Sequence, residues 1–376
     1  MKVAMIGHKV VPSRRGGIEN VLTTLCPLLV EEGIDVTCYN RSSDKVENEY
    51  VGTVEKGKYK GVKIKKAFTL NVKGVSAMIA SFTAAISAAF GKYDVVHFHA
   101  EGPCAAMWIP KLFGKKCVAT VHGLDWQREK WAKGFGSKYI KFGEKMLVKY
   151  ADEVIVLSQS AKDYFKETYN RDTVIIHNGI NAPVYKDAEL ITEKFGLEKD
   201  SYICIISRLT YEKGIHYLID AYNSISTDKK LVIAGDTSDT DEYVKLLRVK
   251  AKDNPNIIFT GFISSDTLYE MYSNAYAVTL PSDLEGMSLS LLEALAYENA
   301  VICSDIPENT LVAEDKALYF KKADISDLAQ KLEYLCSNPD KVKELREGLK
   351  GFVAERYNWK DVAKNTASLY EKITER

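Results

Sequence analysis

Residues 277–305, "AVTLPSDLEGMSLSLLEALAYENAVICSD", change their hydrophobic period twice and predict a strand, a helix and a second strand. The runs "AVTL" and "AVIC" are short, continuous and apolar, which is typical of strands covered on both faces of a parallel sheet. Between them, Glu285 and Glu293 lie eight positions apart across the start of the helix. Eight helical residues rise about 12 Å and leave two side chains on roughly one face.

This spacing has two interpretations. The two carboxylates could hold an elongated ligand at both ends, with a group between them that the helix N-terminus can bind. Alternatively, Glu285 is an acidic residue favoured by the helix dipole and Glu293 is a chance neighbour. The pair alone does not decide between them.

The same alternation of strands and helices runs through the chain, so we predict parallel sheets built from βα units. It pauses in a polar stretch near residues 178–200. We therefore predict an α/β protein of two doubly wound, Rossmann-like domains, residues 1–180 and 198–357, facing across a ligand cleft at the carboxyl ends of their strands. Strand-like runs are residues 2–6, 35–40, 62–68, 94–99, 117–123, 153–158, 173–178, 202–207, 230–235, 256–261, 277–282, 300–305 and 317–320.

The 51 basic residues equal the 51 acidic residues, so no global field attracts nucleic acid. The seven cysteines lack metal-like spacing, and several lie in strand-like runs, which favours reduced core thiols in a cytoplasmic protein. The chain opens on a strand-like run without a basic leader, so we expect no secretion.

The uncharged segment 74–91, "GVSAMIASFTAAISAAFG", is just long enough to be considered as a membrane span. It is rich in Ala and Ser, and a strand-like run follows at once. We therefore expect a helix buried between a sheet and a neighbouring layer.

The turn after the first strand lacks the GxGxxG of nicotinamide-binding domains. It carries Gly16 and Gly17 before a helix, which would let the backbone approach a ligand closely and leave helix N–H groups for an anion. A flexible loop with Gly at the N-cap is the alternative.

In "ISRLTYEKG", Arg208 and Lys213 follow a strand at its carboxyl end. Two cations there suit a diphosphate, with the arginine as a bidentate fork and the lysine as a point charge. The alternative is a solvated pair beside Glu212, but the helix start at "EGMSLS" is expected in the same cleft.

Histidines end several strands of the first domain, but they are spread over three strands and do not predict a zinc site. His122 is distinguished by the glycine that follows it and by an aromatic-rich segment that could form the wall of a sugar pocket. The "DTD" at 239–241 is similar to a metal-binding DxD, but it lies between a strand and a helix, which favours capping. We predict no metal. These histidines and aromatic residues are His97, His99, His122, His177, Trp126 and Trp131.

Together these residues resemble the retaining glycosyltransferases of family 4, which have the GT-B fold. The resemblance covers nearly the whole chain and is carried by Gly16-Gly17, "HG" at His122, "SRLTYEKG", "TGFI" around Gly261 and the E-x7-E pattern preceded by Pro-Ser. It implies an NDP-sugar donor, with UDP expected, retention of anomeric configuration and no metal or other cofactor. It also implies a glycan or lipid-linked glycan acceptor in cell-surface polysaccharide synthesis, and a last helix, 358–376, that crosses back to the first domain.

The resemblance also assigns roles to residues. Arg208 and Lys213 would hold the donor diphosphate, Glu293 the ribose hydroxyls, and Glu285 and His122 would face the sugar. The predicted catalytic residues are thus His122, Arg208, Lys213 and Glu285. The predicted donor-binding residues are Gly16, Gly17, Gly261, Phe262, Gly286, Met287, Ser288, Leu289, Ser290 and Glu293, and the acceptor-side candidates are Arg14, Arg15, His99, Glu101 and Trp126.

One departure concerns the donor pocket. Family members often read E-G-F-G at this point, whereas this chain has Met287 and Ser288, which suggests a narrower pocket. Two other functions stay open: a sugar-nucleotide epimerase of the same fold, which would use acidic residues such as Glu19 and Glu101, and a non-catalytic sugar-nucleotide-binding module. The retained Arg208, Lys213 and glutamate pair argue against the module.

The stretch "KGKYKGVKIKK", residues 56–66, supplies six lysines in the first domain. Such a cluster attracts anionic lipid, or else it forms an ordinary solvated strand face. We therefore expect a cytoplasmic protein, with peripheral attachment to the inner face of the cell membrane as a hypothesis.

Overall fold

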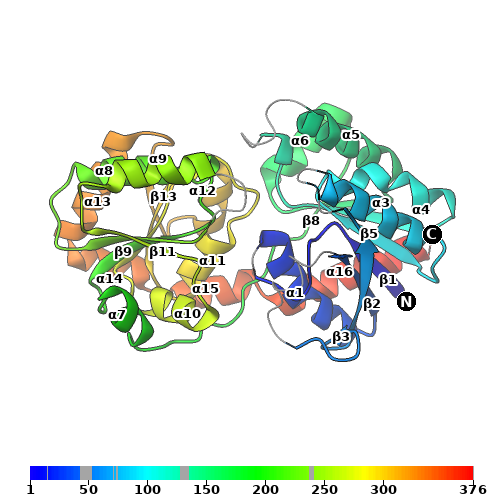
Figure 1. The fold of residues 1–376 in the computed structure, drawn as a ribbon, viewed down its shortest axis with the longest axis horizontal. Helices are drawn as coiled ribbons and strands as arrows, with labels where there is room; N and C mark the ends of the chain where they lie inside the picture. Colours follow the sequence, from blue (N-terminus) through cyan, green and yellow to red (C-terminus); the bar gives the residue numbers. More distant parts are fainter. Residues whose placement is uncertain are drawn as a thin grey trace. The chain divides into compact units, whose positions relative to one another are not determined.

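The computed structural model describes residues 1–14, 16–42, 53–70, 72, 75–127, 135–236 and 241–375. The chain divides into two compact units (Figure 1). Unit 1 is Met1–Gly179 with Tyr357–Arg376, and unit 2 is Ile180–Arg356. Each unit is a sheet of mainly parallel strands with helices on both faces, so the predicted α/β class is confirmed.

Each strand-like run of unit 1 forms a strand, and one short strand between Gly57 and Gly61 was not predicted. The strands are β1 (Lys2–Ile6), β2 (Asp35–Ser42), β3 (Lys58–Tyr59), β4 (Val62–Phe68), β5 (Val95–His99), β6 (Lys116–Val121), β7 (Glu153–Val156) and β8 (Val174–Ile175). Their order is β3-β4-β2-β1-β5-β6-β7-β8, and β3 alone among them pairs antiparallel. The order reverses between β1 and β5, where ligands bind in sheets of this kind.

The helices of unit 1 cover both faces of this sheet, and the closing helix belongs to this unit. They are α1 (Gly17–Glu31), α3 (Ser76–Ala89), η1 (Pro103–Ala106), α4 (Trp108–Leu112), η2 (Asp125–Gln127), α5 (Phe135–Tyr150), α6 (Gln159–Tyr169) and α16 (Trp359–Thr374). α16 packs against α1, and its Tyr370 hydroxyl lies 2.6 Å from His97 Nδ1 of β5. Gly179 must be a glycine because a Cβ there would lie 2.7 Å from the Trp359 ring of α16.

α3 differs from the expectation of burial on both faces. Ala80, Ala84 and Ala88 pack against the sheet, but Ile86 and Phe90 are exposed on the outer face. The small alanines bring the helix close to the strands, and the other side is left open around Ile86 and Phe90. Within the described part of the chain, no helix has both the length and the apolar character needed to cross a bilayer.

Unit 2 has a smaller sheet with the same kind of reversal. Its strands are β9 (Tyr202–Ile206), β10 (Lys230–Ala234), β11 (Ile257–Gly261), β12 (Ala277–Leu280), β13 (Ala300–Ser304) and β14 (Leu318–Phe320). The order β11-β10-β9-β12-β13-β14 is parallel throughout and reverses between β9 and β12. The loops that follow these two strands therefore meet at the carboxyl edge.

Helices of unit 2 lie on both faces of its sheet, with α8 and α9 on one and α10 and α11 on the other (Figure 1). The helices are α7 (Leu190–Phe195), η4 (Tyr211–Lys213), α8 (Ile215–Asn223), α9 (Asp241–Ala251), α10 (Ser265–Asn274), α11 (Leu289–Ala296), α12 (Pro307–Ala313), α13 (Ile325–Ser337), α14 (Pro339–Arg346) and α15 (Leu349–Arg356).

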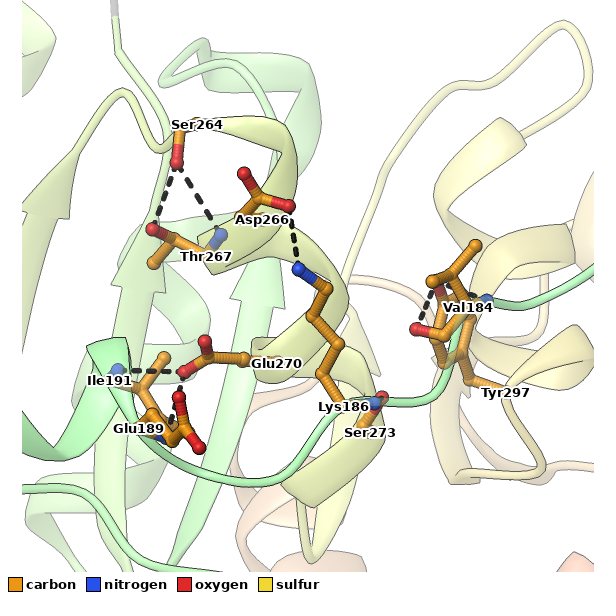
Figure 2. A network of polar contacts seen from close by, with 10 residues as sticks. All are labelled: Val184, Lys186, Glu189, Ile191, Ser264, Asp266, Thr267, Glu270, Ser273 and Tyr297. Carbon is orange, nitrogen blue, oxygen red and sulfur yellow. Dashed lines mark hydrogen bonds and ion pairs between the residues drawn. The ribbon is translucent and has the colours of Figure 1, made fainter.

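The polar stretch near residues 178–200 is joined to α10 by hydrogen bonds and an ion pair (Figure 2). The buried Glu270 carboxylate accepts hydrogen bonds from the backbone N–H groups of Glu189 and Ile191, at 3.1 and 3.0 Å. Lys186 pairs with Asp266 at 2.7 Å on the exposed side of the same helix. These contacts explain why unit 2 begins at Ile180, whereas the predicted second domain began at residue 198.

Candidate active site

In unit 2, the loops after β9 and β12 are held against each other. The N–H of Asp283 donates to the carbonyl of Glu212 at 2.9 Å. Gly214 has a φ of +63°, and a Cβ there would lie 1.9 Å from the carbonyl oxygen of Pro281. Only glycine fits such an approach. No local pattern in the sequence marks Gly214, the last residue of "TYEKG", as necessary for this contact.

This contact brings two predicted catalytic residues together. Lys213 Nζ lies 2.5 Å from Glu285 Oε1, and the two side chains are only 16% and 8% exposed. The hydroxyl of Ser282 donates to the same Glu285 oxygen at 2.7 Å. Ser282 is held in turn, because its carbonyl accepts from the Ser304 hydroxyl at 2.5 Å. The lysine charge is therefore compensated before any ligand binds.

Arg208 behaves differently from Lys213. It lies in the loop directly after β9, it is exposed, and its guanidinium has no ion pair or hydrogen bond among the described residues. A neighbouring glycine shapes this loop, because a Cβ on Gly235 would lie 1.8 Å from the carbonyl oxygen of Ser207. The carboxyl edge of β9 therefore presents one uncompensated cation beside the Lys213–Glu285 pair.

The first turn of α11 lies at the same edge. Ser288 is the N-cap, and its hydroxyl accepts from the N–H of Leu291 at 3.3 Å. The amides of Leu289 and Ser290 fall in the first turn, where the helix itself offers no acceptor. Met287 is buried, and the Ser290 hydroxyl donates to the carbonyl of Ile206 at the end of β9, at 2.8 Å. This serine fixes the helix N-terminus next to the loop that carries Arg208.

Glu293 lies one turn further along α11 and has a structural partner. The buried Tyr272 of α10 donates its hydroxyl to Glu293 Oε2 at 3.0 Å. Burial, with a contribution from Glu293, raises the pKa of Tyr272 well above its usual range, so the phenol stays protonated and remains a donor. The tyrosine thus orients the carboxylate predicted to bind ribose.

Two further predicted donor-binding residues of unit 2, Gly261 and Phe262, lie at the carboxyl end of β11. Gly261 has a φ of +69°, and a Cβ there would meet nothing within 4 Å. Its carbonyl accepts from the N–H of Gly235 at 2.9 Å, and Phe262 next to it is exposed. Gly286 lies between Glu285 and Met287 and is partly exposed.

In unit 1, Gly16 is the N-cap of α1 and Gly17 is its first residue. The Glu19 carboxylate turns back over this helix start, because a Cβ on Gly16 would lie 2.0 Å from Glu19 Oε2. Its other oxygen accepts from the N–H of Lys9 at 2.7 Å. The space beside Gly16 is therefore already occupied by a carboxylate.

Histidines gather near the carboxyl ends of β1, β5 and β6; His8, His97 and His99 are buried, and His122 is half-buried. His99 Nδ1 lies 3.1 Å from His122 Nε2, and the His97 and His99 rings stack at 4.2 Å. Burial lowers the pKa of His97 to about 3 and that of His8 to about 4, so both rings are neutral near pH 7. His8, which follows β1 and lies 2.9 Å from Asn40 Oδ1, was missed by sequence reasoning, although its position at the end of the first strand could have indicated it.

The acceptor-side candidates differ in exposure. Glu101 is fully buried in the turn after β5, whereas Arg14 and Trp126 are half-buried. The Trp126 ring lies 5.9 Å from the Tyr164 ring, with Lys141 Nζ 4.9 Å from its centre. Arg15, Trp131 and the first two residues of "DTD" lie outside the described residues, and Asp241 begins α9. Across the described ranges, no group of three or more His, Cys, Asp or Glu side chains could hold a metal ion.

Both units match known families. The description "Glycosyltransferase Family 4" covers residues 15–182, and "Glycosyl transferases group 1" covers residues 187–352. With two parallel-sheet units and cations at the carboxyl edge of the second, the chain is a GT-B glycosyltransferase of the group 1/family 4 type, as its resemblance predicted. It acts on sugar nucleotides.

Individual relatives are consistent with this family. An uncharacterized glycosyltransferase of Methanocaldococcus jannaschii is 26% identical, over 99% of this chain and 98% of its own. The O-antigen chain mannosyltransferase RfbU of Salmonella typhimurium is 28% identical over 54% of this chain and 56% of its own. HepE of Anabaena, solved with UDP and glucose, shares the fold with a TM-score of 0.81 at 15% identity, over 99% of this chain and 100% of its own.

Proposed function

We propose that this enzyme is a retaining, metal-independent glycosyltransferase that takes its sugar from a UDP-sugar. The observation that carries the proposal lies within unit 2, where the free Arg208, the Lys213–Glu285 pair and the first turn of α11 adjoin one another at the reversal between β9 and β12. Cations and helix N–H groups together suit a diphosphate. The fold shared with a protein solved with UDP and glucose supports the choice of nucleotide.

The proposed reaction proceeds on one face of the sugar. The bond between C1 and the leaving phosphate oxygen breaks, the acceptor oxygen bonds to C1, and the acceptor's proton passes to the leaving phosphate. Negative charge grows on the phosphate as positive charge grows on the ring. Arg208, Lys213 and the amides of Leu289 and Ser290 stabilise the former, and Glu285 stabilises the latter.

The nucleotide would be held at its far end. Glu293 accepts hydrogen bonds from ribose hydroxyls while Tyr272 keeps it oriented, and the main chain at Gly261 and Phe262 contacts the base. The acceptor we propose is a lipid-linked glycan in cell-surface polysaccharide synthesis. The similarity to an O-antigen chain mannosyltransferase supports that class of product.

A donor panel with anomeric analysis tests this function. Purified enzyme is incubated with UDP-, GDP- and ADP-sugars, first alone and then with a glycan acceptor. Nucleotide release is followed, and the anomer of the glycoside formed with the acceptor is determined by NMR. We expect slow release of UDP from one UDP-sugar, a product with the donor's anomeric configuration, and unchanged rates in EDTA. Inversion, preference for another nucleotide, or loss of turnover in EDTA with rescue by Mg²⁺ or Mn²⁺ would each contradict the proposal.

A further inference from the structure

Unit 1 carries a group of exposed apolar side chains around α3 and α4, here called the α3–α4 patch. It consists of Phe68, Leu70, Ile86, Phe90, Leu112 and Phe113, all of them exposed, and Phe90 and Leu112 are each 72% exposed. The Phe90 and Phe113 rings, which follow the ends of α3 and α4, meet edge to face at 4.7 Å. Large exposed apolar surfaces mark interaction sites.

The loop after β4 lies alongside α3 and extends the patch. The Thr83 hydroxyl donates to the carbonyl of Phe68 at 2.8 Å, and the Thr69 hydroxyl donates to that of Ser76 at 2.6 Å. α3 carries no charged residue from Ser76 to Ala89. A helix whose outer face touched only water would normally place charged or strongly polar side chains there.

Lysines border this surface on two sides. Lys65 and Lys66 are exposed on β4, three and two positions before Phe68, and Lys92 is exposed two positions after Phe90. Lys65 Nζ lies 5.6 Å from the centre of the Tyr93 ring. Because Tyr93 directly follows Lys92, the lysines of β4 and Lys92 lie near each other at the end of α3. Among the acidic neighbours of this region, Asp35 and Asp152 are each paired with a lysine, and the exposed Asp94 accepts a hydrogen bond from the N–H of Lys2.

We propose that the α3–α4 patch inserts into the surface of an anionic bilayer, with the bordering lysines at the headgroups. Apolar side chains flanked by lysines are the usual composition of elements that lie in the plane of a membrane interface. α3, with 14 residues, is about 21 Å long and too short to span a bilayer, which agrees with a helix lying along the surface. A second copy of this chain fits less well, because a twofold contact would bring the same lysines together.

The inference does not rest on the proposed donor chemistry. The test is vesicle flotation with phosphatidylcholine alone and with phosphatidylglycerol added. We compare the wild type with Phe90→Ser/Leu112→Ser and with Val249→Ser/Tyr334→Ser, which replaces two exposed apolar residues of unit 2. Wild type and control should bind anionic vesicles about tenfold or more tightly than neutral ones. The patch variant should lose about tenfold or more of that binding.

Two further measurements, donor hydrolysis and sedimentation, distinguish the possible causes of lost vesicle binding. Donor hydrolysis in solution, without vesicles, should be equal in all three proteins, which separates lost binding from lost folding and from failure of the proposed function. Unchanged flotation of the patch variant, equal binding to neutral and anionic vesicles, or no binding by the wild type would overturn the inference. A wild-type dimer in sedimentation that the patch variant abolishes, without vesicle binding, would assign the patch to a second copy.

Discussion

Lys213 Nζ lies 2.5 Å from Glu285 Oε1, so the lysine predicted to hold the donor diphosphate is paired with the carboxylate predicted to face the sugar. Both side chains are largely buried, and removal of one partner leaves the other charge without compensation. The pair therefore sets the charge that an incoming diphosphate meets. Arg208, which is exposed and unpaired among the described residues, becomes the first cation available to the donor.

Arg208→Ala should lower kcat/KM by about a hundredfold, because loss of one preorganised donor at a developing charge costs about 3 kcal/mol. Arg208→Lys should recover only part of the loss, since lysine keeps the charge but not the bidentate fork. Steady-state kinetics with the donor varied provide the measurement. Lys199→Ala, at an exposed lysine of the same unit, is the control, and activity of Arg208→Ala within twofold of that control would remove Arg208 from the mechanism.

Gly214→Ala should disrupt the site, because the added Cβ would lie 1.9 Å from the carbonyl oxygen of Pro281. Gly348 is the matched control: its φ of +73° resembles the +63° of Gly214, but a Cβ there meets nothing within 4 Å. Gly348→Ala should cost only the strain of a positive φ, about 1–2 kcal/mol. Gly214→Ala should cost more in the free energy of unfolding and should also lower kcat/KM. Hydrogen exchange of residues 180–356 measures the loss of stability, and steady-state kinetics measure the loss of kcat/KM. Equal effects of the two variants would mean that the Pro281 contact is unimportant.

Glu270→Ala should destabilise unit 2 by about 1–3 kcal/mol, because it leaves the buried N–H of Ile191 and the partly buried N–H of Glu189 without their acceptor. Asp266→Ala, which breaks the exposed pair with Lys186 on the same helix, should cost at most about 1 kcal/mol. Hydrogen exchange at residues 184–191 measures the difference. Comparable protection in both variants would contradict the role assigned to the buried carboxylate.

Unit 1 should lose stability in mild acid. The pKa of His8 is lowered to about 4 and that of His97 to about 3, so the unfolded chain takes up their protons near pH 6.5, before the folded chain does. The stability they contribute is complete above about pH 6.5 and falls towards pH 4, by up to about 1.4 kcal/mol per pH unit for each ring. All four tryptophans belong to unit 1, so urea unfolding followed by their fluorescence reports this unit. His8→Gln should flatten the dependence on pH; an unchanged slope would exclude His8 as a contributor.

The sequence predicted the strands well because buried parallel strands are read from local apolar runs. It also indicated that Arg208, Lys213 and Glu285 follow strands at one sheet edge, and all three do lie in loops after β9 and β12. The Lys213–Glu285 pair and the need for Gly214 were not predictable. They depend on how closely two loops approach that are far apart in the chain, since Lys213 and Glu285 are 72 positions apart, and no local pattern records that distance.

The outer face of α3 was predicted incorrectly for a related reason. The uncharged, alanine-rich sequence of this helix predicts burial on both sides. Only the packing of the neighbouring elements shows that one side is open. Ser288 is a further case, since its hydroxyl is engaged in capping α11, which sequence alone could not distinguish from a side chain that narrows the donor pocket.

The different roles of the two glutamates are tested most directly by donor kinetics of Glu285→Ala and Glu293→Ala. Glu293 should bind ribose hydroxyls equally in ground and transition states, so its loss should raise KM for the donor and leave kcat nearly intact. Glu285 should act where charge grows during bond cleavage, so its loss should lower kcat by about a hundredfold or more while UDP still binds. Glu285→Gln, which keeps an acceptor for Ser282, should show the same loss of kcat. Similar losses of folding stability in both alanine variants, with no separation of KM from kcat, would contradict the account.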